Sequence, residues 1–321
     1  MLSPLDTLSA NLLSPIVLAF ALGALATLIR SDLRIPDAFY ESLSIYLLFA
    51  IGLKGGVAVS TADPAALVLP AIVTLALGLA TPLWCFAILR RLGRFGRVDA
   101  AAIAAHYGSV SAVTFVATLT FLDHAGIPVE GFVTALVALL EVPGIVVALL
   151  LARSGSSTAW GEALRELLTG KSVILLIGGL VVGFLSGPER FKPVEPLFVG
   201  LFQGALVLFL LELGLVAARR FRDVRAAGPF LIAFAIVMPV VHGVLGAALG
   251  TAAGLSNGGA TILGMLAASA SYIAAPAAVR IALPEANPSL YLTAVLAVTF
   301  PFNLAIGIPF VSEVARVLHG G

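Results

Sequence analysis

The feature that most limits what this chain can fold into is a series of ten apolar stretches joined by short polar segments. A bilayer core about 30 Å thick requires roughly 20 apolar residues in each helix that crosses it. We therefore expect an all-α polytopic membrane protein with ten transmembrane helices. The predicted helices cover residues 14–30, 38–53, 64–89, 99–122, 130–151, 171–187, 194–217, 228–253, 259–281 and 287–315.

The composition suits lipid rather than water as the surrounding solvent. Hydrophobic residues make up 60% of the 321 residues and charged residues only 11%, whereas soluble domains average about 45–50% and about 25%. The net charge of +1 gives no basis for nucleic acid as a partner. The first ten residues contain no lysine or arginine. Because a cleaved signal peptide requires a basic start, we expect the first apolar stretch to be retained as a span.

Lysine and arginine residues are divided unevenly between alternate loops. One set of loops carries 14 of the 18 basic residues, and the other set, which includes both termini, carries Lys54, Arg190, Lys192 and Arg316. Basic residues accumulate in the loops that stay in the cytoplasm. We therefore expect a multi-pass protein of the bacterial inner membrane, with the basic loops in the cytoplasm and both termini outside.

The second half of the chain repeats features of the first half. With a shift of 160 positions, Ser109, Ser111 and Pro128 align with Ser269, Ser271 and Pro288, and a long apolar stretch follows each time. Five helices per half is an odd number, so the second half enters the membrane from the opposite side. The pattern predicts two inverted five-helix repeats, an arrangement that many secondary transporters share.

The predicted domains follow from this repeat. Residues 1–152 form the first repeat, residues 171–321 form the second, and residues 153–170 connect the two in the cytoplasm. The connector is polar and begins with a stretch rich in serine and glycine. We expect it to carry a short amphipathic helix around Trp160 to Leu168.

Each half contains a polar break, built from small residues, inside its fourth helix (helices 4 and 9 of the chain). The first break lies within 107–114 and the second within 269–276. Non-helical backbone at membrane depth must find hydrogen-bond partners, and two breaks that cross at mid-membrane would supply them to each other. The helix N-termini at the breaks carry partial positive charge and free N–H groups, which suits an anion. Close packing of helices is the alternative explanation, because small residues also let membrane helices approach.

Hydroxyl groups in the two breaks are the candidate substrate ligands. They belong to Ser109, Ser111, Thr114, Ser269 and Ser271. Each can donate a hydrogen bond to an anion held at the helix N-termini. The chain has no His-Glu-x-x-His zinc motif and no Gly-x-Ser-x-Gly nucleophile motif, so we expect a carrier rather than an enzyme.

Ionisable residues inside membrane spans are costly, and each is therefore a functional candidate. Glu141 can take up a coupling proton, or it can pair with Arg280 or a histidine. Glu212 can also carry a proton, or it can be a neutral acid that bonds to backbone. His242 can relay protons, because imidazole titrates near neutral pH, or it can cap a helix kink after Pro239.

Several strings in this chain occur together in one known family. They are Gly108-Ser-Val-Ser111, Glu141-Val-Pro143, Pro239-Val-Val-His-Gly243, Leu266-Ala-Ala-Ser269, Pro276, Arg280 and Ala286-Asn-Pro-Ser-Leu-Tyr291. Along nearly its whole length the chain resembles the sodium-dependent bicarbonate transporter family, the SbtA-type permeases. The resemblance implies a core domain and a gate domain, each built from both repeats, that take up bicarbonate with sodium where the broken helices meet. It also implies a homotrimer and a small PII-like regulator on the cytoplasmic face.

The site pattern of this family is matched at Gly108, Ser111, Ser269 and Ser271, which makes the three serines candidate sodium ligands. Tyr272, however, stands where the family has an aspartate. It either fills the space of the ion or donates a hydrogen bond to the substrate. The missing carboxylate weakens the case for sodium coupling, because hard cations favour such oxygen ligands. We therefore expect a secondary carrier of a small anion, with bicarbonate favoured. The alternatives are a proton-coupled carrier of another small anion or weak acid, and a transport-inactive receptor or scaffold.

Overall fold

The chain is helical throughout the part that the computed structural model describes, which comprises residue 9, residues 11–152 and residues 157–320. Within this part, eight helical stretches are long and apolar enough to cross a membrane, and Pro15–Leu28 is a shorter apolar helix. This agrees with the predicted all-α polytopic fold.

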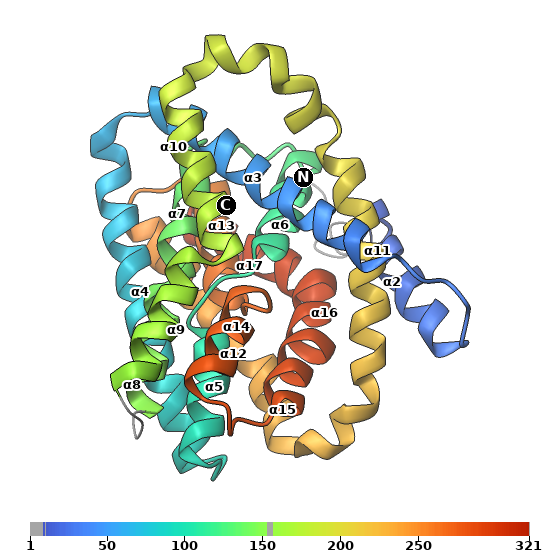
Figure 1. Cartoon of the computed structure of the whole chain (residues 1–321). Helices are drawn as coiled ribbons and strands as arrows, with labels where there is room; N and C mark the ends of the chain where they lie inside the picture. Colours follow the sequence, from blue (N-terminus) through green and yellow to red (C-terminus); the bar gives the residue numbers. More distant parts are fainter. Residues whose placement is uncertain (1–8, 10, 153–156, 321) are drawn as a thin grey trace.

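The helices follow one another with short connections (Figure 1). In the first half they are α2 (Pro15–Leu28), α3 (Asp37–Thr61), α4 (Pro64–Arg91), α5 (Arg97–Tyr107), α6 (Ala112–His124), α7 (Val133–Glu141) and α8 (Pro143–Ala152). The helix α9 (Ser157–Thr169) leads into the second half. That half contains α10 (Lys171–Phe191), η1 (Lys192–Val194), η2 (Pro196–Gly200), α11 (Phe202–Arg220), η3 (Phe221–Asp223), α12 (Val224–Ala252), α13 (Asn257–Ala268), α14 (Ala274–Ala282), α15 (Pro288–Leu292), η4 (Thr293–Thr299), α16 (Phe300–Phe302), η5 (Asn303–Gly307) and α17 (Ile308–Leu318).

The broken helices are the innermost elements of the protein. The most apolar part of Arg97–His124, which contains α5 and α6, is 100% buried, whereas that of Lys171–Val194 is only 28% buried. All residues of α13 from Gly258 onward are also buried. The two breaks are therefore enclosed by protein, while α10 presents much of its apolar surface for lipid to cover.

Two helix pairs pack through glycines on the periphery. In the pair α3 and α10, a Cβ atom at Gly183 would collide with the carbonyl oxygen of Leu53. The pair α2 and α11 lies at one edge of the molecule, with the two helices side by side (Figure 1). Here a Cβ atom at Gly214 would collide with the carbonyl oxygen of Phe20. Close approach of backbones through small residues is a common way for membrane helices to associate.

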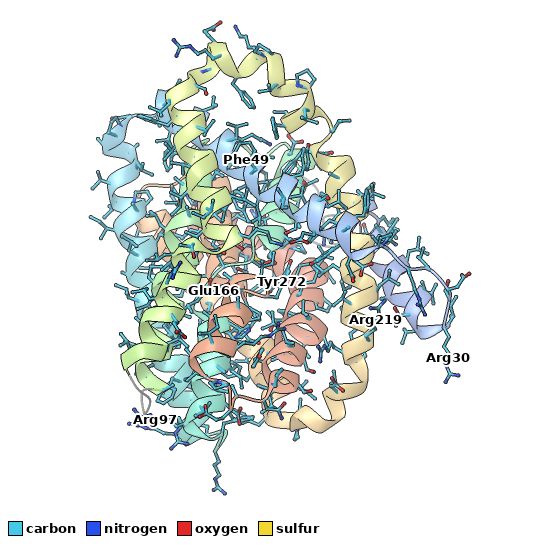
Figure 2. The ribbon with its side chains drawn as sticks, viewed as in Figure 1. Arg30, Phe49, Arg97, Glu166, Arg219 and Tyr272 are labelled. Atoms are coloured by element: carbon cyan, nitrogen blue, oxygen red, sulfur yellow. The ribbon has the colours of Figure 1, made fainter. Side chains whose placement is uncertain are left out.

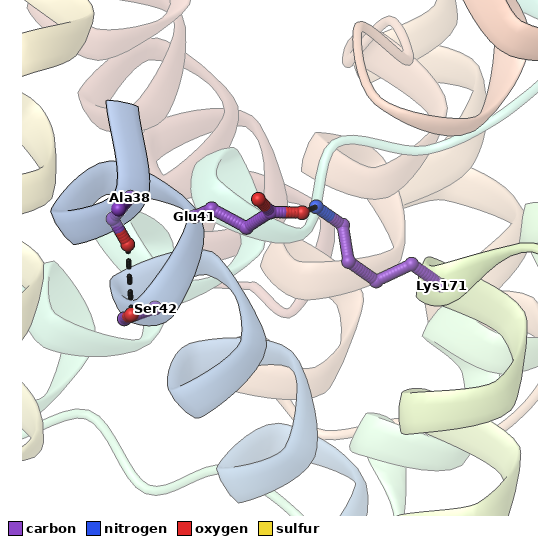
Figure 3. A network of polar contacts seen from close by, with 4 residues as sticks. All are labelled: Ala38, Glu41, Ser42 and Lys171. Atoms are coloured by element: carbon purple, nitrogen blue, oxygen red, sulfur yellow. Dashed lines mark hydrogen bonds and ion pairs between the residues drawn. The ribbon is translucent and has the colours of Figure 1, made fainter. Parts of the chain in front are cut away.

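An ion pair joins the first turns of α3 and α10. Lys171 Nζ lies 3.1 Å from Glu41 Oε1, and Ser42 Oγ donates to the carbonyl of Ala38 one turn earlier in α3 (Figure 3). Both charged side chains are partly exposed, so the pair contributes at most about 1 kcal/mol. The glycine contacts, rather than this ion pair, hold α3 and α10 together.

We expect Gly183→Ala to lower the thermal unfolding midpoint of the purified protein in detergent. The added methyl group would press on the backbone of α3, and overpacking of this kind costs about 1–3 kcal/mol. Gly178→Ala, in the same helix, is the control, because no described atom lies within 4 Å of its Cβ position. Its midpoint should be unchanged or higher, since alanine favours a helix by up to about 1 kcal/mol. Equal midpoints for the two variants would contradict the close packing.

The prediction that Lys54 lies in a loop is wrong. Helix α3 continues past the predicted end at residue 53 as far as Thr61. The ammonium group of Lys54 lies 4.7 Å from the ring centroid of Phe202 and borders an open cavity. The charge therefore has an aromatic face and an open space beside it, and the helix does not need to end before it.

Prolines and glycines account for the other differences from the predicted helices. The α-helix expected from residue 194 begins at Phe202, after 3-10 and π turns that contain Pro193 and Pro196. The helix expected over 130–151 is divided before Pro143, which lacks an N–H group for the helix ladder. In α12 the backbone of Gly228 has φ +81°, so the regular helix starts one residue later.

The amphipathic helix expected in the connector corresponds to α9, which includes residues 160–168. Residues 153–156 of the predicted connector lie outside the described part of the chain. So do residues 1–8, 10 and 321, and with them the ends that the sequence predicts to be outside the cytoplasm.

Candidate functional site

Both predicted breaks are interruptions of helix in the structure. Residues 108–111 separate α5 from α6, and residues 269–273 separate α13 from α14. Tyr272, in the second break, lies near the middle of the molecule, whereas Arg97 lies at its lower end (Figure 2). The breaks therefore lie inside the bundle, where water cannot satisfy their backbone groups.

Hydrogen bonds between the two breaks satisfy some of these backbone groups. The backbone N–H of Ser111 donates to Ser269 Oγ at 2.9 Å. The backbone N–H of Ser271 donates to the carbonyl of His106, near the end of α5, at 2.8 Å. Each break thus completes the other, which is the crossing that the sequence predicted.

Serine hydroxyls cap the two helices that start at the crossing. Ser111 Oγ accepts hydrogen bonds from the backbone N–H and the hydroxyl of Thr114, at 3.1 and 3.0 Å. Ser271 Oγ accepts from the N–H of Ala275 at 3.2 Å. The first N–H groups of a helix have no carbonyl partner within the helix, and no hydrogen bond between described residues uses those of Ala112 and Val113, which are therefore available to a ligand. The positive end of α6 therefore points at the crossing.

A small buried cavity opens at this crossing. Its polar lining consists of Ser111 from the first break, Ser271 and Tyr272 from the second, Glu141 from the end of α7 and Ser172 from the start of α10. Ala112 and Leu48 add apolar surface. The cavity therefore brings hydroxyl groups, a helix N-terminus and one carboxyl group together.

Two polar atoms of this lining have no hydrogen-bond partner among the described residues. They are Glu141 Oε2 and the hydroxyl oxygen of Tyr272. The side chain of Glu141 is buried, with only 4% of the residue exposed, and the Tyr272 ring packs edge-on against Phe300 with centroids 5.7 Å apart. Because buried polar groups in proteins are nearly always paired, unpaired atoms at a cavity indicate a place for a ligand.

The remaining predicted residues of the breaks support the crossing and do not line the cavity. A Cβ atom at Gly108 would lie 3.1 Å from the Cα atom of Gly144, so the missing side chain lets α8 approach the break. Ser109 Oγ donates to the carbonyl of Glu141 at 2.8 Å, which ties the break to the end of α7. Thr114 bonds to Ser111 as described above, and Ser269 Oγ also donates to the carbonyl of Leu266.

The other coupling candidates lie away from this cavity. Glu212 is buried in α11, and its Oε2 atom is also without a partner among the described residues. His242 Nε2 accepts a hydrogen bond from Trp84 Nε1 at 2.7 Å. The predicted pairing of Glu141 with Arg280 is absent: Arg280 is exposed, and no ion pair between described residues includes either side chain.

Sequence reasoning did not find Ser172. It is the second residue of α10 and gives no signal of its own, because a serine at the start of a span is common where helices pack. Only the packing of α10 against the break brings its side chain to the cavity.

A known protein family matches nearly the whole chain. A model of the Na+-dependent bicarbonate transporter superfamily matches residues 15–316, which includes both breaks and every residue of the cavity. A search among curated proteins gave no significant match. The match covers nearly all of the chain, and the family consists of membrane transporters rather than enzymes. The chain therefore belongs to the Na+-dependent bicarbonate transporter superfamily.

Proposed function

We propose that the protein is a symporter that carries bicarbonate together with sodium, and that both ions bind at the crossing, where the small cavity widens to admit them. The observation that supports this most strongly is the meeting of the α6 N-terminus with the unpaired carboxyl group of Glu141 in one buried space. The helix N-terminus attracts bicarbonate. The hydroxyl groups of Ser111, Ser271 and Tyr272 then hydrogen-bond its oxygens.

Glu141 gives a physical reason for coupling the anion to a cation. An ionised carboxylate and a bicarbonate ion in the same buried cavity carry like charges, and unpaired buried charge is costly. A sodium ion bound to Glu141 removes the repulsion, so each ion binds better when the other is present. This mutual dependence is the coupling free energy that symport requires.

The oxygens available for sodium come from several elements. We assign the ion to the Glu141 carboxylate with the hydroxyl oxygens of Ser172 and Ser271. Glu141 thereby supplies the carboxylate that is missing at position 272, where this chain has a tyrosine.

The Ser111 oxygen, also predicted as a sodium ligand, already accepts two hydrogen bonds from Thr114, which leaves its O–H group for the anion. Ser269 was also predicted as a sodium ligand. Its hydroxyl already accepts a hydrogen bond from the Ser111 N–H and donates one to a carbonyl of α13. Its role is to hold the crossing together.

A proton is the second candidate for the coupling ion. The observation that favours it is the buried, unpaired Oε2 atom of Glu141. Protonation makes the carboxyl group neutral and so also removes its repulsion toward the anion. Transport would then follow a pH gradient instead of a sodium gradient.

We further propose the ten-helix arrangement as two inverted repeats, residues 1–152 and 171–321, joined by the connector 153–170. Two contacts between corresponding elements of the two halves support it. The backbone N–H of Ser256 donates to Glu130 Oε1 at 2.6 Å, and that of Asn287 donates to Asp99 Oδ1 at 2.8 Å. The position 160 residues after Asp99 lies in the first turn of α13. The position 160 residues before Asn287 lies in the loop that holds Glu130. The contacts are thus related as inverted repeats require.

The same arrangement suggests how the cavity opens to each side. The pairs α2 with α11 and α3 with α10 form the gate domain, and the helices around the crossing form the core domain. Each domain contains helices of both repeats. Because Leu48 of α3 and Ser172 of α10 line the cavity, sliding of the core past the gate uncovers it. Alternating access of this kind is usual for inverted-repeat carriers.

We place the protein in the bacterial inner membrane with the basic loops in the cytoplasm, and expect lysine labelling to show this orientation. Lys171 and Lys192 flank α10, and 38% and 64% of their side chains are exposed. A membrane-impermeant amine reagent added to spheroplasts should modify Lys192 and spare Lys171. In inverted membrane vesicles the pattern should reverse. Labelling of Lys171 in intact spheroplasts would contradict the orientation.

Uptake of labelled bicarbonate into proteoliposomes tests the substrate. The assay is run at alkaline pH, where little carbon dioxide forms and leaks across the bilayer, with formate, nitrate and chloride as competitors. Uptake above that of protein-free liposomes, reduced by unlabelled bicarbonate more than by the other anions, supports the proposal. Stronger competition by another anion would indicate a different substrate, and an absence of both uptake and binding would leave the receptor or scaffold.

A further inference from the structure

A second, larger cavity lies between the proposed gate and core. It is open to one side, and its empty volume, counted together with the solvent at its mouth, is about 1180 Å³. Its walls come from the later parts of α3 and α6, the loop before α7 and the start of α11. The lining residues used below are Lys54, Val116, Asp123, Glu130 and Phe202. We call this space the vestibule.

Among the described residues that line the vestibule, Lys54 supplies the only basic side chain. Its ammonium group stands 4.7 Å over the ring of Phe202, and no ion pair between described residues includes it. The position is one helical turn after Ile51, deep within α3. A lysine so far inside an apolar helix is costly unless its charge has a use there.

The two acidic groups of the vestibule do not neutralise Lys54 by direct contact. Glu130 is held at the N-terminus of α13, where the N–H and hydroxyl of Ser256 donate to its two carboxylate oxygens at 2.6 and 3.0 Å. Asp123 lines the same space without an ion pair to Lys54. An anion beside Lys54 can therefore accept a hydrogen bond from the ammonium group, while repulsion by the Asp123 carboxylate keeps the binding weak. These are the properties of a weak transit site.

A line of small spaces leads from the vestibule to the crossing. An apolar cavity lies between them and shares Val116 with the vestibule, and Leu48 and Ala112 with the cavity at the crossing. Along α3, Leu48, Ile51 and Lys54 face these three spaces in turn. The vestibule is thus the outer end of a route to the substrate site, closed here by apolar side chains.

We propose that Lys54 forms a first binding site for the transported anion, a small monovalent oxyanion, before it passes the apolar segment to the crossing. This inference rests on the proposed function for the identity of the anion. Lys54 attracts the anion electrostatically at the mouth of the route, and the Phe202 ring holds the ammonium group in place. The site raises the local concentration of anion and does not take part in coupling.

Chemical labelling of the lysines tests this site without relying on transport. Lys54, Lys171 and Lys192 are the only lysines of the chain, so mass spectrometry can follow all of them in the purified protein. Bicarbonate should slow amine modification of Lys54 several-fold and leave Lys171 and Lys192 unaffected. Formate, a planar monoanion that cannot form a carbamate with the amine, should have the same effect. Equal protection of the three lysines, or none, would overturn the proposal.

The variant Lys54→Met gives a second measurement, which also covers the case in which Lys54 does not react. Its KM for bicarbonate uptake should rise about fivefold at low ionic strength, with the maximal rate unchanged, as expected for loss of one partly exposed charge interaction. Lys54→Arg should keep most of the affinity, and Lys192→Met is the matched control. An unchanged KM in Lys54→Met overturns the proposal. Protection of Lys54 without any bicarbonate uptake would instead overturn the proposed function and leave this site standing.

Discussion

Glu141→Gln is expected to abolish cation-driven uptake of bicarbonate. Glutamine has nearly the same size as glutamate, but its amide neither takes up a proton nor offers a negative charge to sodium. Loss of one partner of a buried charged pair costs about 2–5 kcal/mol, which corresponds to roughly 30-fold to several thousand-fold in ion affinity. The measurement is the initial rate of labelled bicarbonate uptake against sodium concentration in proteoliposomes.

The fold of this variant should be intact. Among the described residues, the bond that ties Glu141 to the first break uses its backbone carbonyl, which Ser109 reaches at 2.8 Å, and this bond survives the substitution. Glu212→Gln is the matched control, because Glu212 is a buried acid with an unpaired oxygen that does not line the cavity. It should keep sodium-dependent uptake near the parent level. Loss of coupling in Glu212→Gln with retention in Glu141→Gln would move the coupling site to α11.

Tyr272→Phe is expected to raise the KM for bicarbonate without lowering stability. No hydrogen bond between described residues includes this hydroxyl, although the Ser111 side chain lies close to it, and the tyrosine ring packs against Phe300. A hydrogen bond to a charged ligand contributes about 1.5–3 kcal/mol, so we expect KM to rise roughly tenfold to a hundredfold. The thermal midpoint should stay the same or rise, because an unpaired buried hydroxyl is removed.

Tyr107→Phe provides the contrast for this prediction. The hydroxyl of Tyr107 lies 2.6 Å from Thr299 Oγ1 and does not line the cavity. Its removal should therefore lower the thermal midpoint by an amount equivalent to about 1 kcal/mol and leave the KM unchanged. If Tyr272→Phe lost stability and kept its KM, Tyr272 would be a packing residue and not a substrate ligand.

The sequence was sufficient for the all-α polytopic fold and for the two breaks. Apolar stretches are a strong signal because lipid requires them to be long, and small polar residues inside such a stretch stand out. The repeated spacing of Ser109 and Ser111 against Ser269 and Ser271 also indicated that the breaks would meet. The hydrogen bonds between Ser111 and Ser269, and between Ser271 and His106, confirm that they do.

The composition of the cavity was less accessible from the sequence. Glu141 was a candidate because an acid inside a span is rare, but Arg280, one of the partners considered for it, is exposed and has no ion pair among the described residues. Ser172 comes from a helix in the other half of the chain, and Lys54 was assigned to a loop. Their positions depend on how α3 and α10 pack against the breaks, and hydropathy along a single helix carries no information about such contacts.

The most direct test of the central claim is uptake of labelled bicarbonate into proteoliposomes under an imposed sodium gradient, an imposed proton gradient, or neither. If Glu141 and the serines at the crossing hold sodium, an inward sodium gradient should drive bicarbonate above its equilibrium level, and a proton gradient should not. Accumulation driven by protons alone would assign Glu141 to proton coupling. Failure to accumulate bicarbonate under either gradient would contradict the account of a cation-coupled bicarbonate carrier.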